Sequence, residues 1–125
     1  MKIGRDRGLF VKAGDSVFWL DSGSEGYGFS LITHAHWDHL PNNSSRVIAT
    51  PETASILKLF RNRILEKTLG YGERLKLGDI EISSQPSGHV VGSSQFIIEE
   101  DGVRLVYTGD INTYDSLILR GAKPI

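Results

Sequence analysis

The side chains best suited to chemistry lie in one six-residue segment, His34-Ala35-His36-Trp37-Asp38-His39. It contains three of the four histidines of the chain and one carboxylate. In an extended segment, residues i and i+2 point the same way, so His34 and His36 reach one point together. A helical turn just after them brings Asp38 and His39 to a second point close by. The spacing predicts two adjacent metal sites, for which these ligands favour Zn²⁺ and, less strictly, Mn²⁺ or Fe²⁺.

Two later residues are candidates to complete these sites. His89 lies in a glycine-flanked loop after an expected strand, and beside a three-histidine cluster we interpret it as a third nitrogen ligand. Asp110 follows another expected strand and is either a turn residue or a carboxylate that bridges both metals. Two adjacent metals suit hydrolysis, because one lowers the pKa of a bound water to about 7 while the other holds the leaving oxygen.

Strands with turn signals between them are expected to position these groups. The expected strands cover residues 9–13, 16–20, 29–33, 46–49, 73–77, 79–84, 95–99 and 103–107. Gly14-Asp15, Gly78-Asp79 and Asp101-Gly102 are typical of hairpin turns. Thr50-Pro51-Glu52 predicts a helix start, and its buried stripe is expected to contain Leu57, Phe60 and Ile64.

Asp21 ends the second of these strands, just before Ser22-Gly23. It is either a turn residue before a glycine or an acid that hydrogen-bonds the metal-binding loop. The helical region is the most basic part of the chain, with Lys58, Arg61 and Arg63. These charges either form a solvated helix face or contact phosphate groups beside the metal site.

The composition is that of a soluble globular domain, with 39% hydrophobic and 23% charged residues among 125. This length predicts one domain, residues 1–125. The net charge of −1 gives no overall attraction to nucleic acid or membrane. There is no apolar run long enough for a membrane span and no signal peptide pattern. The absence of cysteine excludes disulfides and thiolate ligands and fits a cytoplasmic location.

The segment from residue 34 to 39 matches the H-x-H-x-D-H motif, and the chain from about Leu9 to Asp110 resembles the metallo-β-lactamase superfamily. The stretches IATPETASIL, SGHVVGSSQFII and VYTGDIN look like its β-CASP group of RNA-processing nucleases and their relatives. The resemblance implies an α/β (α+β) fold, the N-terminal half of a four-layer αβ/βα sandwich. Its sheet would be mixed and mostly antiparallel, with helices on one face.

The resemblance also implies roles for individual residues. His34, His36 and His89 would hold one metal ion, Asp38 and His39 the second, and Asp110 would bridge them. In the family, an aspartate at the position of Asp21 hydrogen-bonds the metal-binding loop. The implied reaction is phosphodiester cleavage of RNA or DNA by a metal-bound hydroxide, with Asp38 as the general base.

The chain departs from the family pattern because no histidine follows His89. Family members continue with a second half that carries a histidine of the second metal site and, in the β-CASP enzymes, another one proposed to protonate the leaving group. One expectation is therefore a nuclease half-domain that a second copy or a partner completes. The alternatives are a metal-binding module without catalysis of its own and another superfamily chemistry, such as thioester hydrolysis or an iron-dependent oxidation. We further expect a sheet face that these 125 residues leave uncovered.

Overall fold

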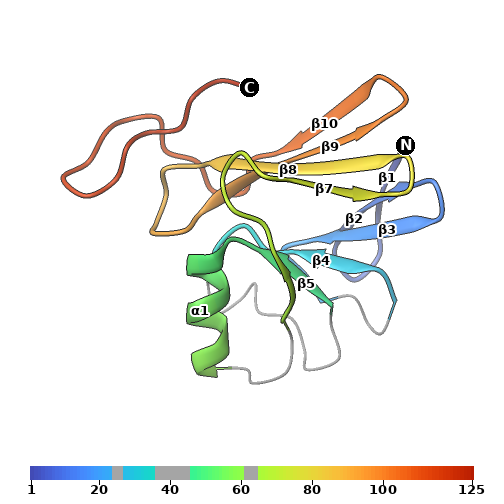
Figure 1. Cartoon of the computed structure of the whole chain (residues 1–125), viewed down its shortest axis with the longest axis horizontal. Coiled ribbons are helices and arrows are strands. Elements are labelled where there is room, and N and C mark those ends of the chain that lie inside the picture. Colours follow the sequence, from blue (N-terminus) through green and yellow to red (C-terminus); the bar gives the residue numbers. More distant parts are fainter. Residues whose placement is uncertain (24–26, 36–45, 61–64) are drawn as a thin grey trace.

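The computed structural model describes residues 1–23, 27–35, 46–60 and 65–125 (Figure 1). In these ranges the chain forms one helix and two sheets. The helix is α1 (Pro51–Phe60). The strands are β1 (Lys2–Arg5), β2 (Leu9–Ala13), β3 (Ser16–Leu20), β4 (Phe29–Leu31), β5 (Val47–Ala49), β6 (Leu65–Thr68), β7 (Arg74–Leu77), β8 (Ile80–Pro86), β9 (Ser94–Glu100) and β10 (Val103–Tyr107).

The first sheet has the strand order β1-β2-β3-β4-β5-β6. Strands β1, β2 and β3 pair antiparallel, and each pair from β3 to β6 is parallel. The second sheet has the order β10-β9-β8-β7 and is antiparallel throughout. The class is therefore α+β with a mixed sheet, as the resemblance implies.

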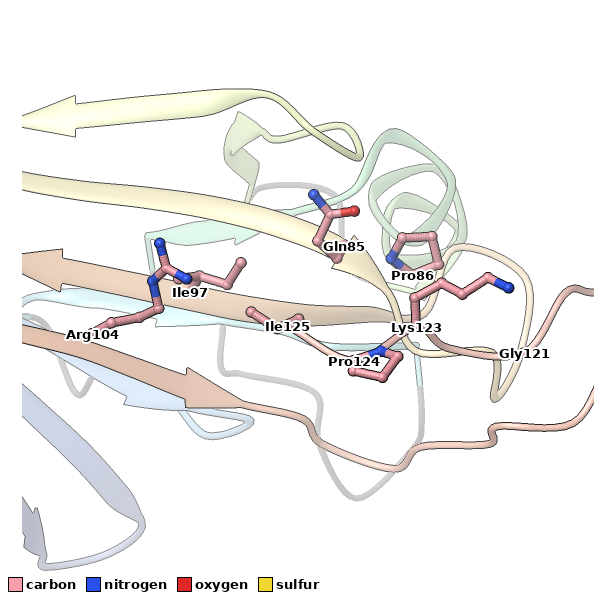
Figure 2. A pocket seen from close by; sticks show the side chains of 8 residues that line it. All are labelled: Gln85, Pro86, Ile97, Arg104, Gly121, Lys123, Pro124 and Ile125. Carbon is pink, nitrogen blue, oxygen red and sulfur yellow. The ribbon is translucent and has the colours of Figure 1, made fainter.

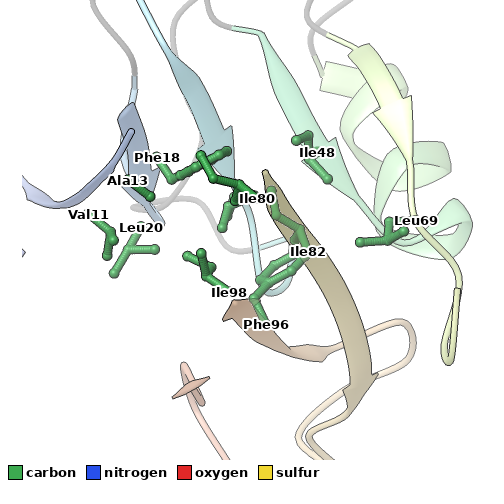
Figure 3. Packing of buried hydrophobic residues seen from close by; sticks show 11 residues of the cluster. Val11, Ala13, Phe18, Leu20, Ile48, Leu69, Ile80, Ile82, Phe96 and Ile98 are labelled. Carbon is green, nitrogen blue, oxygen red and sulfur yellow. The ribbon is translucent and has the colours of Figure 1, made fainter. Parts of the chain in front are cut away.

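The two sheets pack face to face over the main hydrophobic core (Figure 3). The first sheet contributes Phe18 and Ile48, and the second contributes Ile82, Phe96 and Ile98, all of them completely buried. Side chains alternate across a strand, so every second residue of β8 and β9 faces this core. Burying an isoleucine or phenylalanine contributes about 1.5–3 kcal/mol each, which makes this interface the main source of stability.

The expectation of an uncovered sheet face is wrong. Strands β7 to β10 form the second layer over the face that β3 presents, and Phe18 packs against Ile80, Ile82, Phe96 and Ile98 in one cluster. The expectation treats the apolar strands as one sheet that needs a cover on both faces. They form two sheets, and each covers the other.

Helix α1 packs on the outer face of the first sheet (Figure 1). Strand β5 serves both layers, because Ile48 faces the core between the sheets while Val47 and Ala49 contact the helix residue Leu57. The predicted helix start is confirmed, since the Thr53 amide donates a hydrogen bond to Thr50 Oγ1 at 3.2 Å. Of the predicted stripe, Leu57 is buried. The side chain of Phe60 and all of Ile64 lie outside the described part of the chain.

Candidate metal centre

His34 lies three residues beyond the end of β4, past the carboxyl end of this inner strand of the first sheet. The strand register continues past Leu31, because the Ile32 amide donates to the Ile48 carbonyl at 3.1 Å. The side chain of His34 is completely buried. Its Nδ1 lies 2.9 Å from Thr33 Oγ1, so one ring nitrogen is engaged on the protein side.

The hydroxyl of Thr33 fixes which nitrogen of His34 carries the proton. Thr33 Oγ1 donates its one proton to Asp21 Oδ2 at 2.7 Å. The same oxygen must then accept a hydrogen bond from Nδ1–H of His34. Nε2 of His34 is left with a lone pair, which is the form that a metal ligand requires.

His89 and Asp110 come from the second sheet, on the loops that follow β8 and β10. The amides of His89 and Val90 both donate to Ser93 Oγ at 3.1 Å, which gives the loop a compact turn. Asp110 follows Tyr107 by three residues, and 57% of its side-chain surface is exposed. The carboxylate is therefore open to solvent on one side.

The three side chains meet at one point between the two sheets. Their ligand atoms all lie within 4.8 Å of one another, and among the described residues this is the one such group of potential metal ligands. Asp110 Oδ2 lies 3.4 Å from His89 Nε2 and 3.8 Å from His34 Nε2. The two imidazole rings are nearly perpendicular, at 85°.

This donor set fits a transition metal. Two nitrogen or oxygen ligands of one tetrahedral Zn²⁺ lie about 3.3–3.6 Å apart, given metal–ligand distances of about 2.0–2.2 Å. The separation between His89 and Asp110 falls in this range, and that between His34 and Asp110 is slightly longer. The three side chains can hold one ion. The side of the site on which Asp110 lies is open to solvent.

Asp21 connects the two sheets next to the cluster, because it accepts hydrogen bonds from Thr33 on the first sheet's side and from Tyr107 of the second. Its Oδ1 accepts the Thr33 amide at 2.7 Å, and its Oδ2 accepts the hydroxyls of Thr33 and Tyr107 at 2.7 and 3.1 Å. Burial raises the pKa of Tyr107, and the Asp21 carboxylate raises it further, so the phenol stays a donor. Asp21 also adopts a left-handed conformation, with φ of 49°, as a turn residue does. Both interpretations from the sequence therefore have support.

Several predicted residues lie outside the described part of the chain. These are His36, Asp38, His39, Arg61 and Arg63. Their predicted roles as ligands, general base or nucleic-acid contacts stay predictions. Lys58 is described and exposed in the last turn of α1, which is compatible with either interpretation of the basic region.

Sequence reasoning missed Thr33 and Tyr107. Both flank a predicted ligand motif, since Thr33 precedes His34 and Tyr107 begins the segment Tyr107-Thr108-Gly109-Asp110. A hydroxyl next to a ligand motif at the end of a strand was the available signal, because orienting groups must lie close to the ligands they hold.

A cavity of about 290 Å³ lies away from this cluster, on the outer face of the second sheet (Figure 2). The C-terminal residues form one side of it, and side chains of β8, β9 and β10 form the rest. Its lining consists of Gln85, Pro86, Ile97, Arg104, Gly121, Lys123, Pro124 and Ile125. None of these is a predicted site residue, so the cavity adds nothing to the metal centre.

The sequence is similar to those of several curated ribonucleases. It is 29% identical to a ribonuclease of Thermus thermophilus, over 71% of this chain and 27% of the relative. It is 25% identical to an RNase J-like protein of Methanocaldococcus jannaschii, over 66% of this chain and 25% of the relative. An RNase of Saccharolobus solfataricus is 26% identical over 74% of this chain and 25% of its own length. The chain thus spans about a quarter of these curated relatives. No family model matches it.

The structure is similar to solved metallo-β-lactamases. An enzyme of Cronobacter sakazakii matches with a TM-score of 0.66 at 15% identity, over 88% of this chain and 58% of that one. The FEZ-1 enzyme of Legionella gormanii matches with a TM-score of 0.59 at 17% identity, over 88% and 60%. These likenesses define the class, which is the metallo-β-lactamase fold. The chain therefore has the metallo-β-lactamase fold, and its similarity to curated ribonucleases agrees with the resemblance to that superfamily and its β-CASP group.

Proposed function

We propose that this chain carries the metal centre of a phosphodiesterase that cleaves RNA or DNA. In this proposal His34, His36 and His89 would hold one metal ion, Asp38 and His39 would hold a second, and Asp110 would be a ligand of both. Zinc is the proposed ion. The observation that carries the proposal is the convergence of His34, His89 and Asp110 from two different sheets. The similarity to two ribonucleases and an RNase J-like protein supports a nucleic-acid substrate.

The residues of this chain supply orientation and charge. A bound ion of this kind supplies a water of lowered pKa and an electrophile for a phosphate oxygen. Asp21 and Thr33 keep Nδ1 of His34 protonated and its Nε2 available. One carboxylate oxygen of Asp110 lies near Nε2 of both histidines, and the exposed side of Asp110 is one on which substrate can approach. We assign to Asp38 the role of general base.

Metal binding is the first test of this proposal. The wild-type chain should bind at least one equivalent of Zn²⁺ by isothermal titration calorimetry, and His89→Ala should abolish tight binding. Asp79→Ala is the matched control, because Asp79 is a carboxylate in the turn at the opposite end of β8. A wild-type chain without bound zinc under these conditions would contradict the proposal.

Cleavage is the second test. Labelled single-stranded RNA and DNA of the same sequence, incubated with the zinc-loaded protein, should show cleavage that Asp110→Ala and Asp38→Ala each abolish. Near wild-type cleavage by either variant would remove the assigned roles. A chain that binds zinc but cleaves neither substrate would favour the alternative of a metal-binding module that needs further protein for catalysis.

We also propose that a second copy or a partner protein adds to this site. The uncovered sheet face expected from the sequence is not found in the described part of the chain. The support is now the segment just after Asp110, where Tyr114, Leu117 and Ile118 are largely exposed. Several exposed apolar side chains in one segment are typical of an interaction surface. Light scattering at micromolar concentration should give a mass above that of one chain, and a monomeric mass would contradict this part.

The location of this activity is proposed to be the cytoplasm. The absence of cysteine supports it. Helix α1, which is the one helix of the described ranges, is not long and apolar enough to cross a membrane.

A further inference from the structure

The start of helix α1 is bound directly to the loop that carries His89, although the two belong to different layers. The Gly92 carbonyl oxygen accepts a hydrogen bond from Thr50 Oγ1 at 2.7 Å and another from Thr53 Oγ1 at 3.0 Å. Both threonines are buried, with exposed fractions of 1% and 0%. A carbonyl oxygen has two lone pairs, so these two hydroxyls occupy both of them.

The contact between the loop and the helix requires glycine at position 92. Its backbone has φ of +79°, a conformation that favours glycine. A Cβ atom at this position would lie 2.7 Å from Cβ of Glu52 and 2.9 Å from the Thr53 amide nitrogen. Any larger residue would push the loop away from the helix, so the close approach depends on glycine here.

The rest of the loop transmits this contact to His89. Ser93, the residue after Gly92, accepts the His89 amide on its Oγ at 3.1 Å. The Ser93 carbonyl accepts the hydroxyl of Tyr71 at 2.7 Å, which fixes the loop from a third side. Because these bonds are short and the loop spans few residues, a shift of Gly92 must shift the backbone of His89.

The other ligand is tied to the end of the same loop. The Ser94 amide donates to the Thr33 carbonyl at 2.8 Å, directly before His34. The loop is therefore bound at Ser94 to the segment of His34 and at Gly92 to helix α1. Two attachments on different residues define both the position and the tilt of the loop.

We propose that Thr50 and Thr53 are positioning residues of the metal centre, which set the distance between His89 and His34 by binding Gly92. This inference rests on the proposed function, in which His34 and His89 bind the same ion. The start of α1 is then part of the site. The capping of the helix by Thr50 is a second role of the same hydroxyl, which accepts the Thr53 amide while it donates to Gly92.

The test compares the full chain with the variant T50V/T53V, which removes both hydroxyls at almost constant volume. Binding of Co²⁺, followed by its visible absorption, should weaken by about 10- to 100-fold, the usual effect of losing groups that orient metal ligands. The variant T50S/T53S keeps both hydroxyls and should restore wild-type affinity. The single variant T53V leaves the helix cap intact and should show a smaller loss in the same direction, which keeps the test valid if the double variant does not fold.

A matched control separates positioning from general stability. Ser84 is completely buried, and its hydroxyl donates to the carbonyls of Leu69 and Gly70 at 3.2 and 3.1 Å. S84A should lower the melting temperature, as T53V does, but leave the affinity for Co²⁺ unchanged. An equal loss of affinity in S84A would show that T53V acts through stability alone and would overturn the inference.

A metal-free measurement completes the test. In the apo protein, hydrogen exchange at the amides of His89 and Val90 should be faster in T50V/T53V than in wild type, while exchange in the core strand residue Ile98 should be unchanged. If T50V/T53V has the wild-type affinity for Co²⁺ and the wild-type exchange rates, the inference about Thr50 and Thr53 is wrong, while the proposed function still stands. A wild-type chain that binds no Co²⁺ would overturn the proposed function, and this inference with it.

Discussion

Replacement of Asp21 by alanine is expected to lower the free energy of unfolding by about 5.5 kcal/mol, from three hydrogen bonds and backbone strain. The change removes the acceptor of three hydrogen bonds, from the Thr33 amide, the Thr33 hydroxyl and the Tyr107 hydroxyl. Hydrogen bonds to a charged group contribute about 1.5–3 kcal/mol each. Asp21 and Tyr107 are half-buried, so water replaces part of the loss and the low end of this range applies. Alanine at φ of 49° adds about 1 kcal/mol of backbone strain.

Two other variants test the predicted loss of stability. Asp21→Asn keeps one acceptor oxygen and a residue type that tolerates the left-handed conformation, so it should lose about half as much. Asp115→Ala is the matched control, because the Asp115 carboxylate accepts one hydrogen bond, from the Gly121 amide at 2.8 Å, and Asp115 is exposed. The control should lose less than about 1 kcal/mol.

Urea denaturation followed by far-UV circular dichroism measures these differences, provided that the transition is two-state. Zinc affinity is measured on the same samples, and Asp21→Ala should weaken it by about 10- to 100-fold because the Nδ1 proton of His34 is no longer fixed through Thr33. A loss of stability within 1 kcal/mol of the Asp115→Ala control would refute the argument. Stability loss without any change in zinc affinity would show that the carboxylate is structural alone.

Three further outcomes are expected. The contribution of Tyr107 to the free energy of unfolding should fall above about pH 10, because its raised pKa means that the folded chain holds a proton which the unfolded chain releases. Burial also raises the pKa of Tyr71, so Tyr107→Phe should reduce this fall in urea titrations without removing it. Gly92→Ala should cost about 2–4 kcal/mol in the same assay, from the left-handed backbone and the contact with Glu52. Zinc at 100 times its dissociation constant should stabilise the chain by about 2.7 kcal/mol, and a melting temperature independent of zinc would contradict binding to the folded state.

Local patterns in the sequence predicted most strands well. The strands at residues 9–13, 16–20 and 103–107 have the predicted bounds, because hairpin turns with glycine or aspartate at positive φ mark their ends. Strand β1 was missed because its residues, Lys2–Arg5, are mostly polar. It forms as an edge partner of β2, where Gly4 lies against the ring of Phe10. That contact depends on the partner strand and leaves no local pattern.

The division into two sheets was beyond the sequence argument. An apolar strand such as β9 reads the same whether its second face meets a helix or another sheet. The candidate site was predicted better than its surroundings, because ligands at the ends of strands converge whichever sheet each strand joins. His34, His89 and Asp110 meet as the order of motifs suggested, and their role as ligands stays a prediction. The hydroxyls of Thr50, Thr53 and Tyr107 had no motif of their own.

The placement of His34 on one sheet and of His89 and Asp110 on the other has a consequence for folding kinetics. The second sheet consists of hairpins between neighbours in the sequence, which close on the microsecond scale, whereas docking of the sheets joins residues far apart in the chain and is slower. Neither sheet alone holds all three side chains. During refolding, a coloured ion such as Co²⁺ would therefore acquire its bound spectrum when the sheets dock, and the rate of that change would report the docking step directly.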